Sequence, residues 1–191
     1  MRILPIAGLV LAAAFSLSSA DAGSVDTSVG TVEQGGVHAC DILTVDFIKE
    51  VLGTGDFKPE DDRRADRAGR RASTYSSCTV KWKSSKTREM EVGGRTLTVP
   101  DENRITLSVS IFKPGKGQAA YDAGVNHLKE RNDHESVSGI GEEAMWFPAM
   151  RQISVRGKGQ VFHLALRYAD GEGEPLEYAK TMAMKVLKKL E

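Results

Sequence analysis

The sequence has few cysteines and few aromatic residues, and it has no excess of charge of either sign. In 191 residues there are two cysteines and 6% aromatic residues, and 26 basic residues balance 26 acidic ones. This balance argues against nucleic acid as a partner, because domains that bind it are usually basic. Hydrophobic residues make up 40% of the chain, which is enough for the core of about one domain and excludes a disordered or fibrous protein.

The sequence also lacks the short motifs of common catalytic and nucleotide-binding sites. It contains no G-x-S-x-G nucleophile motif and neither of the glycine-rich phosphate-binding loops. The best set of metal ligands is His127, Glu130 and His134, whose spacing is not that of a zinc protease. Asn132 and Asp133 are expected to end the helix before His134. We therefore expect no metal, no cofactor and no catalytic residue.

The first residues have the pattern of a secretory signal peptide. Arg2 precedes an apolar run from Ile3 to Leu17, and small residues follow at Ala20 and Ala22. Cleavage after Ala22 is preferred to cleavage after Ala20. The apolar run is shorter than the roughly 20 residues that span a membrane, so no stable membrane insertion is expected after cleavage. The pattern predicts a periplasmic or secreted protein.

The two cysteines, Cys40 and Cys78, both lie in the part of the chain that is expected to be exported. Oxidising compartments permit disulfides, so we predict that the two pair. The bridge would stabilise the fold by roughly 4 kcal/mol in the chain-entropy model. Residues 23–38 are rich in Gly, Ser and Thr and are expected to form a flexible leader, so the sequence predicts a single domain over 39–191.

The clearest helix follows Cys40. Thr44 is a suitable N-cap, Leu43 is placed to contact Ile48, and Gly53 provides the C-terminal stop. Residues 54–75 have acidic residues first and arginines afterwards with almost no hydrophobic period, and they predict a long solvated loop.

Strand patterns dominate the rest of the chain. From Cys78 onward Val80 and Trp82 share one face, which predicts that Trp82 lies in the core. Gly93 and Gly94 suit the turn of a hairpin that is mostly polar and is expected to project beyond the sheet. The further expected elements are a strand over 104–112 that follows residues 100–103, a helix over 118–131, a strand over 143–147, a hairpin of 153–156 with 161–168, and a helix that begins at 174–175.

This order of elements predicts an α+β fold. We expect an antiparallel sheet with two or three helices packed on one face and one disulfide. The sequence offers two groups of candidate binding residues, one apolar and one cationic. Aromatic and thioether side chains could line a ligand cleft or a protein contact, although a place in the core is the other interpretation, and guanidinium groups bind carboxylates or phosphates. The candidates are Trp146, Phe147, Met150 and Tyr168, together with Arg63, Arg64, Arg70 and Arg71.

Three segments together resemble a known family. They are the run 40–53, the run 77–82 and the run Val137–Ala144. In this order they resemble a family of secreted bacterial proteins of unknown function, many of them actinobacterial lipoproteins. More distantly they resemble the extracytoplasmic sensor domain of a mycobacterial serine/threonine kinase. The resemblance implies an α+β fold with a disulfide between the first helix and the first strand, in a module that is not an enzyme, although this chain lacks the lipidated cysteine.

The sequence thus favours an exported, soluble module without enzymatic activity. Its partner would be an extracytoplasmic protein or a small apolar ligand, as in an inhibitor, an immunity-type protein or a ligand sensor. The alternative is an extracytoplasmic hydrolase with a carboxylate or histidine site.

Overall fold

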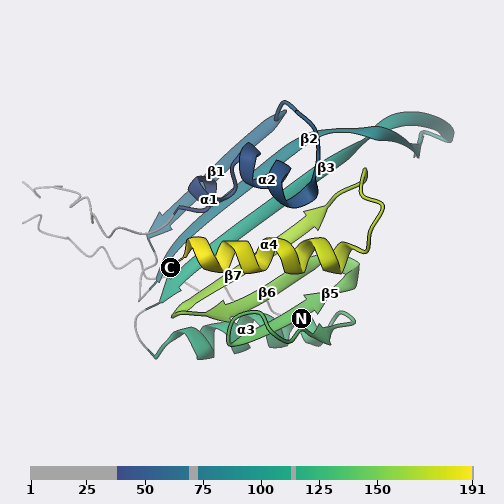
Figure 1. Cartoon of the computed structure of the whole chain (residues 1–191). Helices are drawn as coiled ribbons and strands as arrows, with labels where there is room; N and C mark the ends of the chain where they lie inside the picture. Colours follow the sequence, from purple (N-terminus) through teal and green to yellow (C-terminus); the bar gives the residue numbers. More distant parts are fainter. Residues whose placement is uncertain (1–37, 69–72, 113–114, 191) are drawn as a thin grey trace, which may run out of the picture. The chain divides into compact units, whose positions relative to one another are not determined.

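The computed structural model describes residues 38–68, 73–112 and 115–190. It contains an antiparallel sheet of seven strands in the order β1-β2-β3-β7-β6-β5-β4 (Figure 1). The expected α+β fold with an antiparallel sheet is therefore confirmed. The strands are β1 Asp61–Ala68, β2 Ser73–Val92, β3 Arg95–Phe112, β4 Glu135–Ser136, β5 Glu143–Phe147, β6 Gln152–Gly157 and β7 Gln160–Arg167.

The helix signals of the sequence are present where they were expected. In α2 the Thr44 hydroxyl accepts a hydrogen bond from the Phe47 backbone N–H at 3.2 Å, and Gly53 ends the helix with a φ of 62°. α4 has its proline within the first two helical positions. The helices are α1 Ala39–Ile42, α2 Val45–Leu52, α3 Gly117–Lys129, the 3-10 turn η1 Pro148–Met150, and α4 Pro175–Lys189.

Alternating side chains divide the apolar residues between the two faces of the sheet. Trp146 belongs to a large cluster with Cys78, Trp82 and the buried residues of α1, α2 and α4. Its neighbour Phe147 belongs to a second cluster with Tyr121 of α3. Consecutive residues of a strand point to opposite faces, so α3 packs on the face opposite to α4. Figure 1 shows α1, α2 and α4 together on the near side of the sheet.

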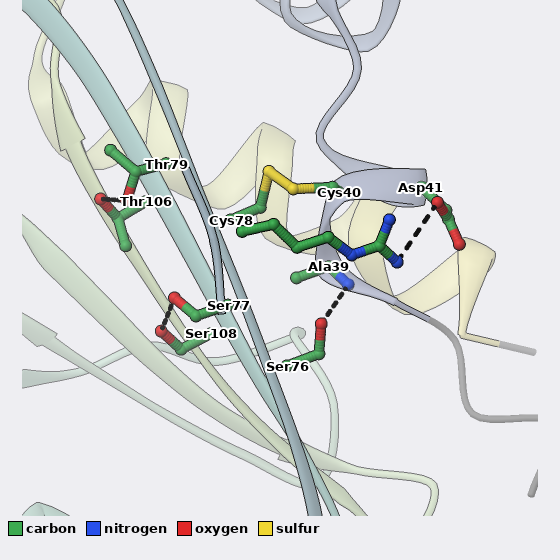
Figure 2. Close-up of a disulfide and its surroundings, with 10 residues drawn as sticks. Ala39, Cys40, Asp41, Ser76, Ser77, Cys78, Thr79, Thr106 and Ser108 are labelled. Atoms are coloured by element: carbon green, nitrogen blue, oxygen red, sulfur yellow. Dashed lines mark hydrogen bonds and ion pairs between the residues drawn. A yellow bond between two sulfur atoms is a disulfide. The ribbon is translucent and has the colours of Figure 1, made fainter. Parts of the chain in front are cut away.

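A disulfide joins α1 to β2. Cys40 and Cys78 are bonded as expected, with their Cα atoms 5.0 Å apart (Figure 2). Beside the bridge, the Ala39 backbone N–H donates to the Ser76 hydroxyl at 2.9 Å. Ala39 and Ile42 are almost fully buried, so this short helix, which the sequence pattern did not predict, closes one side of the core.

Two predictions about the strands were wrong. Residues 54–75 are not one long loop, because β1 lies within them and pairs with β2 from Asp61 opposite Lys81 to Ala68 opposite Thr74. The strands expected over 95–99 and 104–112 are one strand, because residues 100–103 lie inside β3. Pro100 is tolerated there because β7 begins to pair with β3 only at Arg104, so no strand needs the missing N–H on that side.

The hairpin around Gly93 and Gly94 projects beyond the sheet, as expected (Figure 1). We call residues 87–100 the arm. Thr87–Val92 and Arg95–Pro100 pair in an unbroken register with one another. The ladders to β1 and β7 do not reach them. In the ranges that the structure covers, no helix is long and apolar enough to cross a membrane.

Candidate functional site

An open pocket of about 660 Å³ lies where β3 and β7 meet the loops that follow η1 and β7. Its size is in the range of small-molecule sites, about 300 to 1,000 Å³. The wall combines cationic, hydroxyl and apolar side chains. The side chains that matter here are Asp101, Arg104, Arg151, Arg167, Thr106, Met150 and Tyr168, and Gly171, Gly173 and Pro175 complete the rim.

Three arginines reach the pocket from separate elements. Arg104 of β3 stands directly opposite Arg167 of β7 in the strand register. Arg151 lies between η1 and β6 with a φ of 49°, and its carbonyl accepts the Leu166 N–H at 2.9 Å. A positive φ is uncommon for a residue other than glycine. This tight turn places Arg151 next to β7, so the sheet gathers cations that are far apart in the sequence.

Two of these arginines are neutralised by carboxylates of β3. Like charges directly opposite one another destabilise a sheet. Arg167 donates to Asp101 at 2.6 Å, and Arg104 donates to Glu102 through two nitrogens at 2.9 and 2.5 Å. The Glu102 backbone N–H, burial and Arg167 all act on Asp101, and the net effect lowers the pKa of that carboxyl. Asp101 is therefore ionised at neutral pH and holds Arg167 in place.

Arg151 differs from the other two arginines. Arg151 is exposed, and within the described ranges its side chain forms no salt bridge with a carboxylate. Arg104, Arg151 and Arg167 line the pocket, and among the described residues Asp101 is its one lining carboxylate. Arginine binds carboxylates and phosphates through two parallel hydrogen bonds. The pocket has the donors and the surplus positive charge to hold an anion.

Aromatic rings support the loop that forms the rim. Tyr168 packs edge-on against Tyr178, with ring centroids 5.5 Å apart, and lies 6.4 Å from the Trp82 ring. Burial raises the pKa of Tyr168. A Cβ atom at Gly171 would come within 2.7 Å of the Tyr168 ring, so only glycine lets the chain pass this close. The rim is thereby fixed next to the arginines.

The structure brings two of the predicted binding residues together. Met150 and Tyr168 both line the pocket. Trp146 and Phe147 are buried, with 4% and 0% exposure, and point to opposite faces of the sheet. The aromatic and thioether cluster expected over 146–150 is thus divided between core and pocket.

Arg63 and Arg64 of the predicted arginine run do not line the pocket. Arg63 and Arg64 are exposed residues of β1, and Arg64 approaches Asp41 of α1 at 3.9 Å. Arg70 and Arg71 fall outside the described residues. The sequence reasoning missed the pocket arginines because each is an isolated residue in its own segment. The strand register that brings Arg104 opposite Arg167 is not visible in the sequence.

The candidate metal ligands of the hydrolase alternative lie at the surface of the described chain. His127, Glu130 and His134 are all exposed. Across the described part of the chain no three His, Cys, Asp or Glu side chains gather as a metal site. His163 and Ser154 make a hydrogen bond of 2.8 Å, but Ser154 has no exposed surface. Burial lowers the pKa of His163, so the pair is a contact between neutral groups within the sheet.

Hydroxyl groups on β2 and β3 bond to one another across the strands. The Ser77 and Ser108 hydroxyls are 3.0 Å apart, as are those of Thr79 and Thr106 (Figure 2). Tyr75 donates to Ser108 at 3.2 Å. These contacts hold the neighbouring strands together, and Thr106 also lines the pocket.

No family model matches the chain, and neither a curated protein sequence nor a solved structure matches it.

Proposed function

We propose that this protein is an exported binding module without enzymatic activity and that its ligand presents an anionic group to the arginine pocket. The observation that carries the proposal is Arg151, a cation at the pocket that has no carboxylate partner within the described chain. Arg104 and Arg167 add two further guanidinium groups, each with one carboxylate. An anion bound there would complete the charge balance of the pocket.

The chemistry of the walls describes the rest of the ligand. Met150 and Tyr168 offer a thioether and an aromatic ring beside the guanidinium groups. A ligand with an anionic end and an apolar body would contact both kinds of wall. An inhibitor that holds an acidic group of its target and a sensor of an organic anion both fit this description.

The expected location and class agree with this role. The signal-peptide pattern of residues 1–22 supports export, and the Cys40–Cys78 disulfide suits an oxidising compartment. The resemblance to secreted bacterial modules supports binding rather than catalysis. Binding of anions at the pocket is therefore the direct test of the proposed function.

Titration calorimetry with phenyl phosphate and with citrate tests the proposal, and phenol is the neutral control. We expect saturable binding of the two anions and none of phenol. Arg151→Gln should weaken anion binding about tenfold, because one charge-assisted contact contributes about 1.5 kcal/mol. Arg131→Gln is the matched control, since Arg131 is exposed beyond α3 and does not line the pocket. The proposal is wrong when neither anion binds, or when the Arg151 and Arg131 variants bind alike.

A further inference from the structure

The arm has two unlike faces. Because side chains alternate along a strand and the register of the arm is unbroken, Met90 and Leu97 lie opposite one another on the same face. Three apolar side chains on that face are exposed, namely Met90 at 37%, Val92 at 50% and Leu97 at 46%. The other face carries acidic and threonine side chains, Glu89, Glu91, Thr96 and Thr98.

The exposed apolar side chains of the protein are concentrated at the arm and the pocket. Among the described residues five large hydrophobic side chains are exposed, and Met184 is the one outside these two places. Met150 lines the pocket, and the other three are those of the arm. A two-stranded hairpin is only marginally stable in water, and exposed apolar patches mark interaction sites. The distribution marks the arm and the pocket as the two places where a partner would find exposed apolar side chains.

An ion-pair chain connects the arm to the pocket. Arg88 lies on the apolar face of the arm, and its Nε is 3.6 Å from Oδ1 of Asp101. The same oxygen accepts the hydrogen bond of Arg167 at 2.6 Å. Asp101 and Arg167 both line the pocket. Asp101 therefore marks the place where the arm and the pocket meet.

The unpaired charge on the apolar face of the arm and at the pocket is positive. Arg95, opposite Val92 at the end of the arm, lies on the apolar face and forms no ion pair with any described residue. Arg88 shares its carboxylate with Arg167. With Arg151 at the pocket, the surface offers cations at both of its ends, separated by apolar side chains. Charge complementarity requires an acidic occupant that also carries apolar groups.

We propose that the arm and the pocket together bind an acidic segment of a partner protein in an extended conformation. Apolar side chains of the segment pack on Met90 and Leu97, and a carboxylate near its end enters the pocket beside Arg151. Among the described strands β3 pairs in the arm only with β2, so the backbone of its other edge can accept an added strand. Along the arm the segment needs about six residues, because at about 3.3 Å per residue the path from Arg95 to Asp101 covers roughly 20 Å, and a few more residues reach into the pocket. This inference rests on the proposed function and adds the class of partner.

Fluorescence anisotropy with labelled ten-residue peptides tests this proposal. The probe carries glutamate near both ends and valines at alternate positions between them, and the control peptide replaces each glutamate with lysine. We expect the acidic peptide to bind at least about tenfold more tightly than the basic one. The double variant Met90→Thr, Leu97→Thr should weaken acidic-peptide binding about tenfold, while its affinity for phenyl phosphate stays that of the parent protein.

The matched control is Thr96→Ala, Thr98→Ala on the opposite face of the arm, which should bind the acidic peptide like the parent. Both double variants change exposed residues, and an unchanged melting temperature shows that they fold. Equal binding of the two peptides overturns the proposal, and so does an acidic-peptide affinity that the Met90 and Leu97 changes leave intact. Co-sedimentation with phosphatidylglycerol vesicles, when the acidic peptide fails to bind, overturns it in favour of a lipid surface.

These results are distinguishable from a failure of the proposed function. When phenyl phosphate does not bind but the acidic peptide binds through the arm, the pocket function is wrong and the arm inference holds. When phenyl phosphate binds through Arg151 but the arm variants change nothing, the pocket function holds and the arm inference is wrong.

Discussion

Asn103 holds the loop after β7 against β3, because its side-chain amide both donates and accepts a hydrogen bond to that loop. Its amide nitrogen donates to Asp170 Oδ2 at 2.6 Å, and its amide oxygen accepts the Ala169 backbone N–H at 2.8 Å. Asn103 has no exposed surface. Asp170 in turn accepts three bonds through Oδ1, at 2.7 Å from the Ser84 hydroxyl and at 2.8 and 2.7 Å from the backbone and hydroxyl of Ser85. This network fixes the base of the arm and the rim of the pocket to one another.

Removing the amide of Asn103 should destabilise the protein strongly. Asn103→Ala leaves the Ala169 N–H without its acceptor and removes one donor from Asp170. We expect the free energy of unfolding in urea to fall by about 2 to 3 kcal/mol. Asn132→Ala is the control, because the Asn132 amide makes a single bond, to the Leu128 carbonyl at the end of α3, and its loss should cost about 1 kcal/mol or less. Equal losses for the two variants would contradict the role assigned to Asn103.

The same network should make stability depend on acid pH. Burial opposes ionisation of Asp170, but hydrogen bonds from Ser84, Ser85 and Asn103 outweigh it and lower the pKa from 3.8 to about 2. A carboxyl whose pKa is lower in the folded state stabilises the protein above its unfolded pKa. That contribution is complete above pH 3.8 and is lost as the pH falls toward 2.

Urea unfolding of the parent protein and of Asp170→Asn at several acid pH values measures this contribution. We expect the parent to be the more stable protein at pH 5 and above, and the difference to shrink steadily below that. Other carboxyls with lowered pKa values, such as Asp101, act equally in both proteins and cancel in the comparison. A difference that is the same at every pH would show that the Asp170 charge has no part in stability.

Gly141 should tolerate no side chain, in contrast to Gly139. Both glycines have a positive φ, of 63° and 78°. A Cβ at Gly141 would come within 2.5 Å of the Arg156 carbonyl oxygen and 2.9 Å of Val155, whereas one at Gly139 would meet nothing within 4 Å. We expect Gly139→Ala to cost about 1 kcal/mol from φ strain alone and Gly141→Ala to cost about 3 kcal/mol or more. Thermal unfolding of the two variants checks the order, and similar melting temperatures would show that the close approach is relieved by a small shift.

Much of the fold could be predicted because its signals are local. Thr44 and Gly53 bound a helix by the groups that each offers to its own backbone. The buried side of β2 follows from the alternation of Cys78, Val80 and Trp82, all of which lie in the core. β1 was missed because its residues are mostly charged, and its strand conformation comes from pairing with β2 rather than from a hydrophobic pattern.

The candidate site was only partly predictable because it depends on register. Met150 and Tyr168 were found as apolar side chains near turns, and they line the pocket. Arg104 and Arg167 become neighbours only when β3 pairs with β7. The pairing of strands that are far apart in the sequence is set by the packing of the whole sheet, so no short sequence pattern predicts it.

The disulfide should contribute most of the free energy that holds α1 against β2. Cys40 and Cys78 close a loop with a sequence separation of 38, and in the chain-entropy model such a bridge contributes roughly 4 kcal/mol. Without it, Ala39 keeps its bond to Ser76, but α1 is a single turn and short helices depend on tertiary contacts. We expect dithiothreitol to lower the free energy of unfolding in urea by about 3 kcal/mol, and the double variant Cys40→Ala, Cys78→Ala to be insensitive to it. An identical urea midpoint for the oxidised and reduced parent protein would show that packing of α1 on β2 suffices without the covalent bond.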